Sequence, residues 1–67
     1  MAKAYKKIDV VGISEKSMSD ALDNAVHKAS ESVRNLAWFE VDELRGKIKD
    51  GKIHEYQATV KIGFRLD

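Results

Sequence analysis

The most regular hydrophobic pattern in this chain lies at its end, over residues 52–66. Apolar residues occupy every second position from Tyr56 to Leu66, and polar residues or glycine stand between them. This alternation is typical of a β-strand that buries one face. At about 3.4 Å per residue, a strand from Lys52 to Leu66 extends roughly 50 Å. Such a strand either curls around the rest of the chain or reaches beyond it.

The start of the chain, Lys3–Ile13, also predicts a strand, because it is rich in β-branched residues. Ile8 and Val10 share one face, which continues at Gly12, and the odd-numbered apolar residues face the other way. Since Gly12 has no side chain to pack, we expect a bend or a bulge near the end of this strand.

After this strand the hydrophobic period changes to that of a helix, which we predict over residues 18–35. Ser17 and Asp20 have the spacing of a capping box, and a start one turn earlier, at Ser14, is the alternative. Acidic residues come early and basic residues late, which suits the helix dipole. The apolar stripe is rich in alanine and consists of Met18, Ala21, Leu22, Ala25, Val26, Ala29 and Val33.

Residues Leu36–Lys49 predict a second strand with an irregularity inside it. Phe39 and Val41 share one parity, whereas the later apolar positions share the other. A strand of period two changes parity only where an extra residue is inserted. We therefore expect a β-bulge near Asp42–Glu43 or a bend at Gly46.

The predicted topology is β-α-β-β, in the α+β class. Asp50-Gly51 is a strong hairpin signal, so the last two strands are antiparallel. A right-handed crossover places the first strand parallel to the second, and the long last strand fits between them. The result is a three-stranded antiparallel sheet in the order 1-3-2, partly wrapped around one helix, with its apolar face against the helix stripe.

Composition limits the ways in which this chain is stabilised. Its 67 residues form one domain, residues 1–67, and contain no cysteine, so a disulfide is excluded. With two histidines and no thiol, we expect no structural zinc site. A domain of this size has little hydrophobic energy beyond what the ordering of its chain costs. We therefore expect burial of surface between subunits to stabilise it.

Charge and hydropathy exclude several kinds of partner. Twelve basic and eleven acidic residues leave a net charge of +1, so there is no strong field for nucleic acid or an anionic membrane. No apolar run approaches the roughly 20 residues of a membrane span, and Met1–Lys7 has no signal-peptide core. We expect a cytoplasmic protein with neither nucleic acid nor membrane as a partner.

Trp38, the only tryptophan, is the first candidate for binding chemistry. By parity it faces away from Phe39 and Val41, and hence away from the side that the helix covers. A large ring in that place has to be covered by something, either a flat ligand or a neighbouring subunit. Gln57, on the outward face of the last strand, offers amide donors and an acceptor.

The chain carries no recognisable catalytic set. We find no Ser-His-Asp arrangement, no Gly-rich phosphate loop and no paired-carboxylate signature, and we therefore expect a protein that is not an enzyme. The basic residues of the two later strands either carry solvated charge or meet a phosphate, which suits the forked donors of arginine. They are Arg45, Lys47, Lys61 and Arg65.

Several short motifs resemble the dodecin family in their order and spacing. They cover essentially the whole chain and are Tyr5–Gly12, Ser14-Glu15, Leu36–Val41, Arg45-Gly46, Glu55–Gln57 and Val60–Leu66. The resemblance implies the same β-α-β-β fold and a hollow homododecamer of cubic symmetry. It also implies non-enzymatic flavin binding for storage, buffering or photoprotection, with two flavins stacked between tryptophans of two subunits.

The resemblance further assigns roles to particular residues. Trp38 matches the stacking tryptophan, and Gln57 matches the amide that pairs with the polar edge of the isoalloxazine. Arg45 matches an arginine near the flavin, and Arg65 is the candidate for contact with the ribityl phosphate. The expected flavin is FMN, with riboflavin or FAD as alternatives, and some bacterial members of the family also hold coenzyme A.

Two other functions stay open on the sequence alone. A homo-oligomeric scaffold would use its polar sheet face to bind another macromolecule or coenzyme A. An RNA-binding sheet would use Trp38 as a base platform, although one such ring and a net charge of +1 are poor support for it. A purified protein that is yellow would favour the flavin hypothesis over both.

Overall fold

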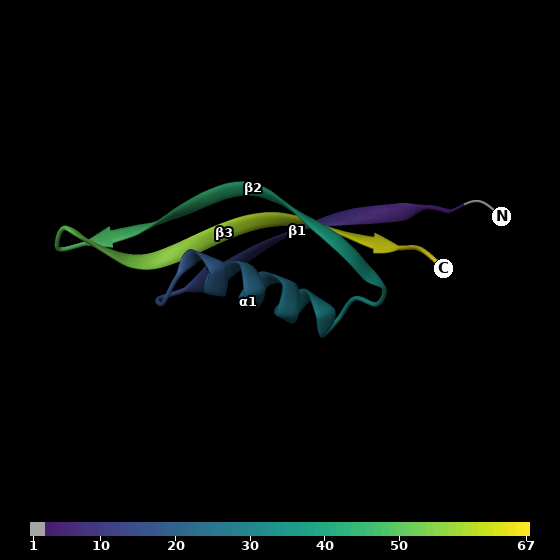
Figure 1. Cartoon of the computed structure of the whole chain (residues 1–67), viewed down its shortest axis with the longest axis horizontal. Helices are drawn as coiled ribbons and strands as arrows, with labels where there is room; N and C mark the ends of the chain where they lie inside the picture. Colours follow the sequence, from purple (N-terminus) through teal and green to yellow (C-terminus); the bar gives the residue numbers. More distant parts are fainter. Residues whose placement is uncertain (1–2) are drawn as a thin grey trace.

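The computed structural model describes residues 3–67, which form one helix against a three-stranded sheet (Figure 1). The elements follow one another as β1 (Tyr5–Ser14), α1 (Met18–Ser30), β2 (Leu36–Lys49) and β3 (Lys52–Arg65). The predicted β-α-β-β order is confirmed. No helix in this described range combines the length and the apolar character that crossing a membrane requires.

The long strand β3 forms the centre of the sheet. It pairs antiparallel with β1 on one side and with β2 on the other, which gives the order β1-β3-β2. Val60 of β3 lies opposite both Val10 of β1 and Val41 of β2. The predicted antiparallel sheet in the order 1-3-2 is therefore confirmed.

The core lies between α1 and one face of the sheet. It combines alanines of the helix with aliphatic side chains of β3, and Val60 and Ile62 are its largest fully buried members within residues 3–67. The core is small because the helix contributes mostly methyl groups. The residues of this core, each at most 6% exposed, are Ala21, Ala25, Ala29, Ala58, Val60 and Ile62.

Gly12 lies where α1 approaches β1 closely. A Cβ atom built on it would come 2.0 Å from the carbonyl oxygen of Ala21 and 2.8 Å from the Cβ atom of Ala25. The pairing of β1 with β3 continues through Gly12 without a register shift, so the bulge expected at this position is absent. The missing side chain serves close helix packing instead.

The predicted start of α1 at Met18 is confirmed, whereas its C-terminal end differs from the prediction. Ser17 is the N-cap, since its hydroxyl accepts a hydrogen bond from the Asp20 amide at 3.0 Å. The Asp20 carboxylate accepts from the Ser14 hydroxyl at 2.7 Å instead of closing a capping box on Ser17. The helix stops at Ser30, so the predicted end at residue 35 is wrong. Asn35 has a left-handed φ of 64° and turns the chain into β2, which has to lie beside β3.

The predicted bulge in β2 is present. The register with β3 shifts between Val41 and Glu43, so that Asp42 is the inserted residue. Val41 and Leu44 consequently face the same side although their parities differ. Further shifts lie between residues 36 and 38 and between residues 47 and 48. Of the two positions predicted for an irregularity, Asp42–Glu43 and Gly46, the first is therefore confirmed.

The bulge also directs the Asp42 carboxylate onto the sheet face opposite α1, which we call the outer face. The Nζ atom of Lys61, on β3, donates to Asp42 of β2 and, at 3.1 Å, to Asp9 of β1. These bonds, Asp42 first, raise the pKa of Lys61 from its ordinary value of 10.5. The link between the three strands is therefore in place at neutral pH and is lost as the pH rises through that raised pKa.

The molecule is elongated, as the long β3 predicts (Figure 1). It measures 55 × 20 × 13 Å and has a radius of gyration of 13.9 Å, whereas a compact chain of this length has one of about 11 Å. Its accessible surface is 5081 Å², compared with roughly 4,300 Å² for a compact monomer of this mass. The excess indicates surface that a single chain does not cover.

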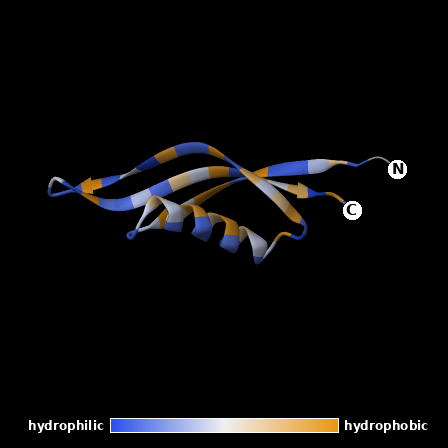
Figure 2. Cartoon of the chain, viewed as in Figure 1, coloured by the Kyte–Doolittle hydropathy of each residue, from blue (hydrophilic) through white to orange (hydrophobic). Residues whose placement is uncertain are grey.

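Much of this uncovered surface belongs to β2. The helix packs on β1 and β3 and barely touches β2, which also carries apolar positions along its length (Figure 2). We call Phe39, Val41 and Leu44 the β2 strip. They pair with core residues of β3, and yet they are 50%, 46% and 52% exposed. A row of apolar side chains on an edge strand indicates a contact surface.

Candidate functional site

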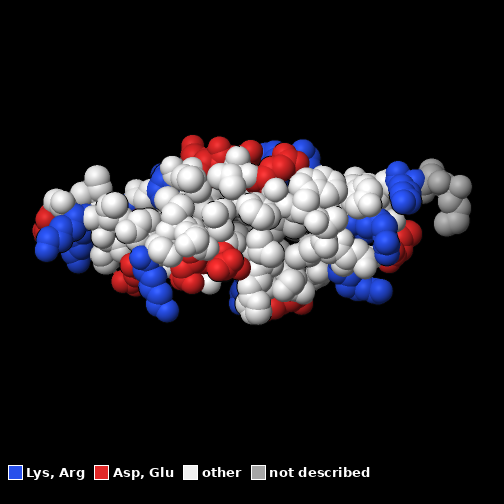
Figure 3. All heavy atoms as spheres, in the orientation of Figure 1, with Lys and Arg blue, Asp and Glu red and all other residues white. Residues whose placement is uncertain are grey.

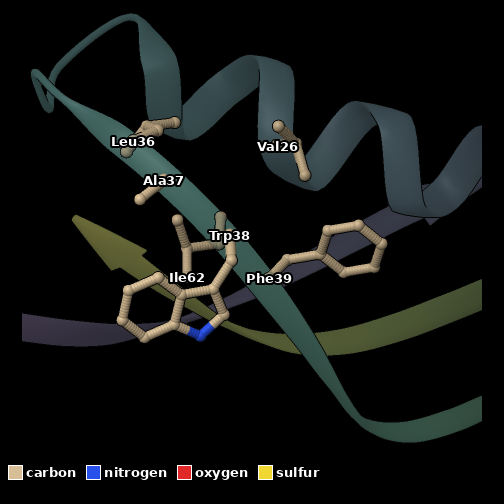
Figure 4. Close-up of a pocket in the computed structure, with 6 residues that line it drawn as sticks. All are labelled: Val26, Leu36, Ala37, Trp38, Phe39 and Ile62. Atoms are coloured by element: carbon tan, nitrogen blue, oxygen red, sulfur yellow. The ribbon is translucent and has the colours of Figure 1, made fainter.

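Trp38 lies on the outer face, near one end of the sheet. It pairs with Gly63 of β3, whereas its neighbour Phe39 pairs with the core residue Ile62. The two rings accordingly leave β2 in different directions (Figure 4). The prediction that Trp38 faces away from the helix side is confirmed.

The indole of Trp38 lies flat on the backbone at Gly63. A Cβ atom built on Gly63 would come within 2.5 Å of the indole atoms Cε2 and Cζ2 and within 2.7 Å of Cδ2. Such similar distances to adjacent ring atoms mean that the ring turns its face, and not its edge, toward the strand. Trp38 is nevertheless 40% exposed. It therefore forms a flat aromatic surface on the central strand, which we call the Trp38 platform.

Side chains from two strands contact the edges of the platform. The Tyr5 ring on β1 has its centroid 5.2 Å from that of Trp38, with an interplanar angle of 58°, within the usual range for aromatic pairs. The indole Nε1–H donates a hydrogen bond to Glu40 at 2.9 Å. Lys7 donates to the two oxygens of the same carboxylate at 3.2 and 3.3 Å. All three strands thus hold the indole in place.

The outer face beside the platform is a network of opposite charges. The hydrogen bond from Trp38, and after it the one from Lys7, lower the pKa of Glu40 from its ordinary value of 4.5, so Glu40 is ionised at neutral pH. Acidic side chains gather over the middle of β2 (Figure 3). Lys7 and Lys61 pair with Glu40 and Asp42 across the sheet. The platform therefore adjoins a neutralised surface and not a field of one sign.

Gln57 and Arg45 lie directly opposite each other farther along the outer face. The half-buried Gln57 donates a hydrogen bond from Nε2 to the Glu55 carboxylate at 2.7 Å. This bond orients the amide and leaves its Oε1 acceptor and its second N–H for a ligand. The Arg45 side chain is 64% exposed and lies 3.6 Å from Glu43.

The predicted site residues form two separate pairs within one chain. Trp38 is the cross-strand partner of Gly63, whereas Arg45 is the cross-strand partner of Gln57. Positions 63 and 57 are six residues apart on β3, which is roughly 20 Å at about 3.4 Å per residue. Arg65 belongs to the Trp38 end, because it is two positions beyond Gly63 and points to the same face. A single flat ring therefore does not reach from Trp38 to Gln57 of the same chain.

Sequence patterns alone did not identify Gly63, Glu40 and Tyr5 as parts of the platform. The sequence does contain an indication for Gly63, since a glycine on the outward face of a regular strand often marks a place where another group packs closely against the backbone. Glu40 is two positions from Trp38 and hence on the same face. The missing information was the register, which places Tyr5 and Gly63 beside the same ring.

Replacing Gly63 with alanine is expected to displace the Trp38 indole from the sheet. The added methyl group would lie 2.5 Å from the ring, so the side chain has to leave its position, at a cost of about 1–3 kcal/mol. The emission of Trp38 should then shift to longer wavelength as the ring becomes hydrated. Gly51→Ala is the control, because its added Cβ atom meets nothing within 4 Å and its left-handed φ of 74° strains only the hairpin turn, away from Trp38. An unchanged spectrum for Gly63→Ala would contradict the close contact between ring and backbone.

An apolar hollow of about 170 Å³ lies between the start of β2, Val26 of α1 and Ile62 of β3 (Figure 4). It contains no charged side chain, and so it offers packing surface and no polar recognition. No cluster of three or more metal-ligating side chains lies within residues 3–67. The lining residues of the hollow are Val26, Leu36, Ala37, Trp38, Phe39 and Ile62.

The fold and the platform together define a small α+β module in which one helix covers a three-stranded antiparallel sheet and a tryptophan lies flat on the opposite face. The Dodecin family model matches residues 4–67. The chain belongs to the dodecin family, and the resemblance seen in its sequence motifs is confirmed.

Individual relatives agree over nearly the whole chain. A curated Dodecin from Thermus thermophilus is 43% identical over 67 residues, which are 100% of this chain and 97% of that protein. The crystal structure of the tt0972 protein from Thermus thermophilus has a TM-score of 0.95 at 42% identity and covers 98% of this chain and 97% of its own. The dodecin from Streptomyces davaonensis has a TM-score of 0.95 at 43% identity and covers 100% of this chain and 98% of its own.

Proposed function

We propose that this protein binds flavin without chemical turnover, storing it and protecting it from light. The observation that carries the proposal is the Trp38 indole, which lies flat over Gly63 and is 40% exposed on the outer face. A ring that is already held in place loses little freedom when another flat ring stacks on it. The isoalloxazine of a flavin is such a ring.

The other predicted residues fit the remaining parts of a flavin. The Gln57 amide, oriented by Glu55, offers an acceptor and a donor that match the alternating groups on the polar edge of the isoalloxazine. Arg65, beside the platform, has forked donors that suit the phosphate of FMN, and Arg45 adds positive charge next to Gln57. We therefore propose FMN as the ligand, with riboflavin and FAD as alternatives.

A complete site of this kind needs more than one copy of the chain. Trp38 and Gln57 of one chain are roughly 20 Å apart along β3. An isoalloxazine that contacts both residue types therefore draws Trp38 from one subunit and Gln57 from another. We propose the homododecamer, which membership of the dodecin family implies, as the assembly that brings them together.

The distribution of apolar surface supports assembly independently of any ligand. The β2 strip is about half exposed, whereas Val60 and Ile62 are the largest fully buried side chains within residues 3–67. Each further 100 Å² of apolar surface covered by a neighbouring subunit would stabilise the fold by about 2.5 kcal/mol. A few such contacts are comparable with the whole stability of a small domain.

A bound flavin would supply a ring that absorbs light and accepts electrons. The contribution of the chain is to hold that ring, to exclude water from the face that lies on Trp38 and to quench its excited state, because an indole in contact with it is an electron donor. These roles need no acid–base residues, and the proposal includes none.

Equilibrium dialysis against FMN, riboflavin and AMP tests this proposal. AMP shares a phosphate and a flat aromatic ring with FMN but lacks the polar edge of the isoalloxazine. We expect FMN to be retained most strongly, riboflavin less strongly and AMP hardly at all. Retained FMN should sediment with a species much larger than the 7.6 kDa chain. Equal retention of AMP and FMN, or no retention of FMN, would contradict the proposal.

Replacing Gln57 with leucine is expected to weaken FMN binding by about 1–3 kcal/mol, because the polar edge of the flavin would then lack partners in a confined site. The assembly should persist, since the expected contact surface is the β2 strip, and Gln57 lies on the opposite, outer face. Thr59→Val is the matched control, as it removes a polar group two positions away on the same face. Unchanged FMN affinity in calorimetric titration of Gln57→Leu would remove this residue from the site.

A further inference from the structure

The Trp38 indole has its hydrogen-bond partner on its own strand. Nε1–H donates to Glu40 at 2.9 Å, and the two residues share the outer face because they are two positions apart. The Glu40 carboxylate is itself held by Lys7, which donates to its oxygens at 3.2 and 3.3 Å. Glu40 thus connects an aromatic ring on β2 with a cation on β1.

The glycine beneath the indole makes this connection possible. Gly63 of β3 has Lys7 as its partner on β1 and Trp38 as its partner on β2. Because Gly63 has no side chain, the indole lies directly against its backbone, and Lys7 reaches across β3 to Glu40 beside it. One face of the ring therefore packs on Gly63, and its N–H edge is fixed by the hydrogen bond to Glu40.

We propose that Glu40 is a positioning residue that fixes the rotation of the Trp38 indole, so that the ring lies flat and open before a flavin stacks on it. An exposed aromatic side chain without such a bond samples several rotamers, and the ordering of those rotamers weakens binding. The consequence for flavin affinity rests on the proposed function. The consequence for the ring itself does not.

The charge of Glu40 makes this bond sensitive to acid. Lys7 from β1 and Lys61 from β3 face it as cations, Asp9 and Asp42 face it as anions, and α1 packs on the opposite side of the sheet. The hydrogen bonds from the indole and from Lys7 lower the pKa of the carboxylate from 4.5. The bond therefore has its full charge-assisted strength above the ordinary pKa of glutamate and weakens as the pH falls through the lowered one.

The test begins with the flavin-free protein, since Trp38 is the only tryptophan and reports its own mobility. In Glu40→Leu the fluorescence anisotropy of Trp38 should fall and its emission maximum should shift, and Glu40→Gln should show part of this change. Asp42→Asn is the matched control, because it removes the same charge two positions away but pairs with Lys61 and not with the indole. Far-UV circular dichroism verifies that each variant is folded.

Two further measurements test whether the position of the Trp38 ring responds to acid and whether it affects FMN binding. On acidification, the wild-type Trp38 emission should change with a midpoint below pH 4.5, and Glu40→Gln should lack this transition. At neutral pH, FMN binding by Glu40→Leu should be about three- to tenfold weaker than by the wild type. Asp42→Asn should bind FMN as the wild type does.

The outcomes separate this inference from the proposed function. Unchanged Trp38 anisotropy and emission in a folded Glu40→Leu variant would overturn the positioning role, even if the wild type binds FMN. A lowered anisotropy with FMN affinity equal to that of the wild type would overturn its relevance to binding. If Glu40→Leu loosens the ring but the wild type binds no FMN, the positioning of the indole stands and the proposed function fails.

Discussion

Replacing Trp38 with alanine is expected to weaken FMN binding about 5- to 140-fold and to restore the emission of any FMN that is still bound. Stacking of a flat ring on an aromatic side chain contributes about 1–3 kcal/mol, and each 1.4 kcal/mol is a factor of ten in affinity. The variant removes the indole that would act as electron donor to the excited flavin. Fluorescence titration measures the emission of the bound FMN. Equilibrium dialysis of the same samples measures the affinity without relying on that emission.

The fold of this variant should persist, because the indole lies on the outer face and makes no part of the core between α1 and the sheet. Trp38→Phe is the conservative comparison, since it keeps a flat ring but loses the N–H that bonds to Glu40. We expect its FMN affinity to lie between those of the wild type and Trp38→Ala. If Trp38→Ala bound FMN as tightly as the wild type, the platform would not be the binding surface.

Replacing Leu44 with lysine is expected to break the assembly and, with it, the stability of the chain. Leu44 is 52% exposed, because it lies on the helix side of the sheet where α1 does not cover β2. In an isolated chain a lysine in its place would therefore be tolerated. In a subunit interface an unpaired charge costs several kcal/mol. Because Val60 and Ile62 are the largest fully buried side chains within residues 3–67, we expect loss of assembly and loss of cooperative folding to occur together.

Sedimentation velocity and thermal unfolding measure this second effect. His27→Lys is the control, since it adds a similar charge on the solvent side of α1, where the side chain is 79% exposed. We expect the control to sediment and unfold as the wild type does. A Leu44→Lys variant with the sedimentation coefficient and melting temperature of the wild type would show that the β2 strip is not an interface.

Most of the fold follows from hydrophobic periodicity. The alternation from Tyr56 to Leu66 predicts the buried face of β3, and the change of parity after Val41 predicts the bulge at Asp42. The end of α1 does not follow, because Val33 continues the apolar stripe beyond Ser30, where the helix stops. The turn at Asn35 depends on where β2 has to pair, and helical periodicity carries no such information.

The site was less predictable than the fold, and the reason is register. Parity placed Trp38 on the outer face, and the family resemblance singled out Gln57, Arg45 and Arg65. Neither shows that Gln57 lies beside Arg45 and far along β3 from Trp38. That separation appears only when the strands are paired.

The most direct test of the account is the emission of FMN as wild-type protein is added to it, with sedimentation of the same samples. We predict that FMN moves into a species of many subunits and that its emission falls in proportion to the fraction bound, because the flavin then lies on Trp38. FMN that binds to the assembly with its emission undiminished would contradict the account, since the flavin would then lie away from the indole.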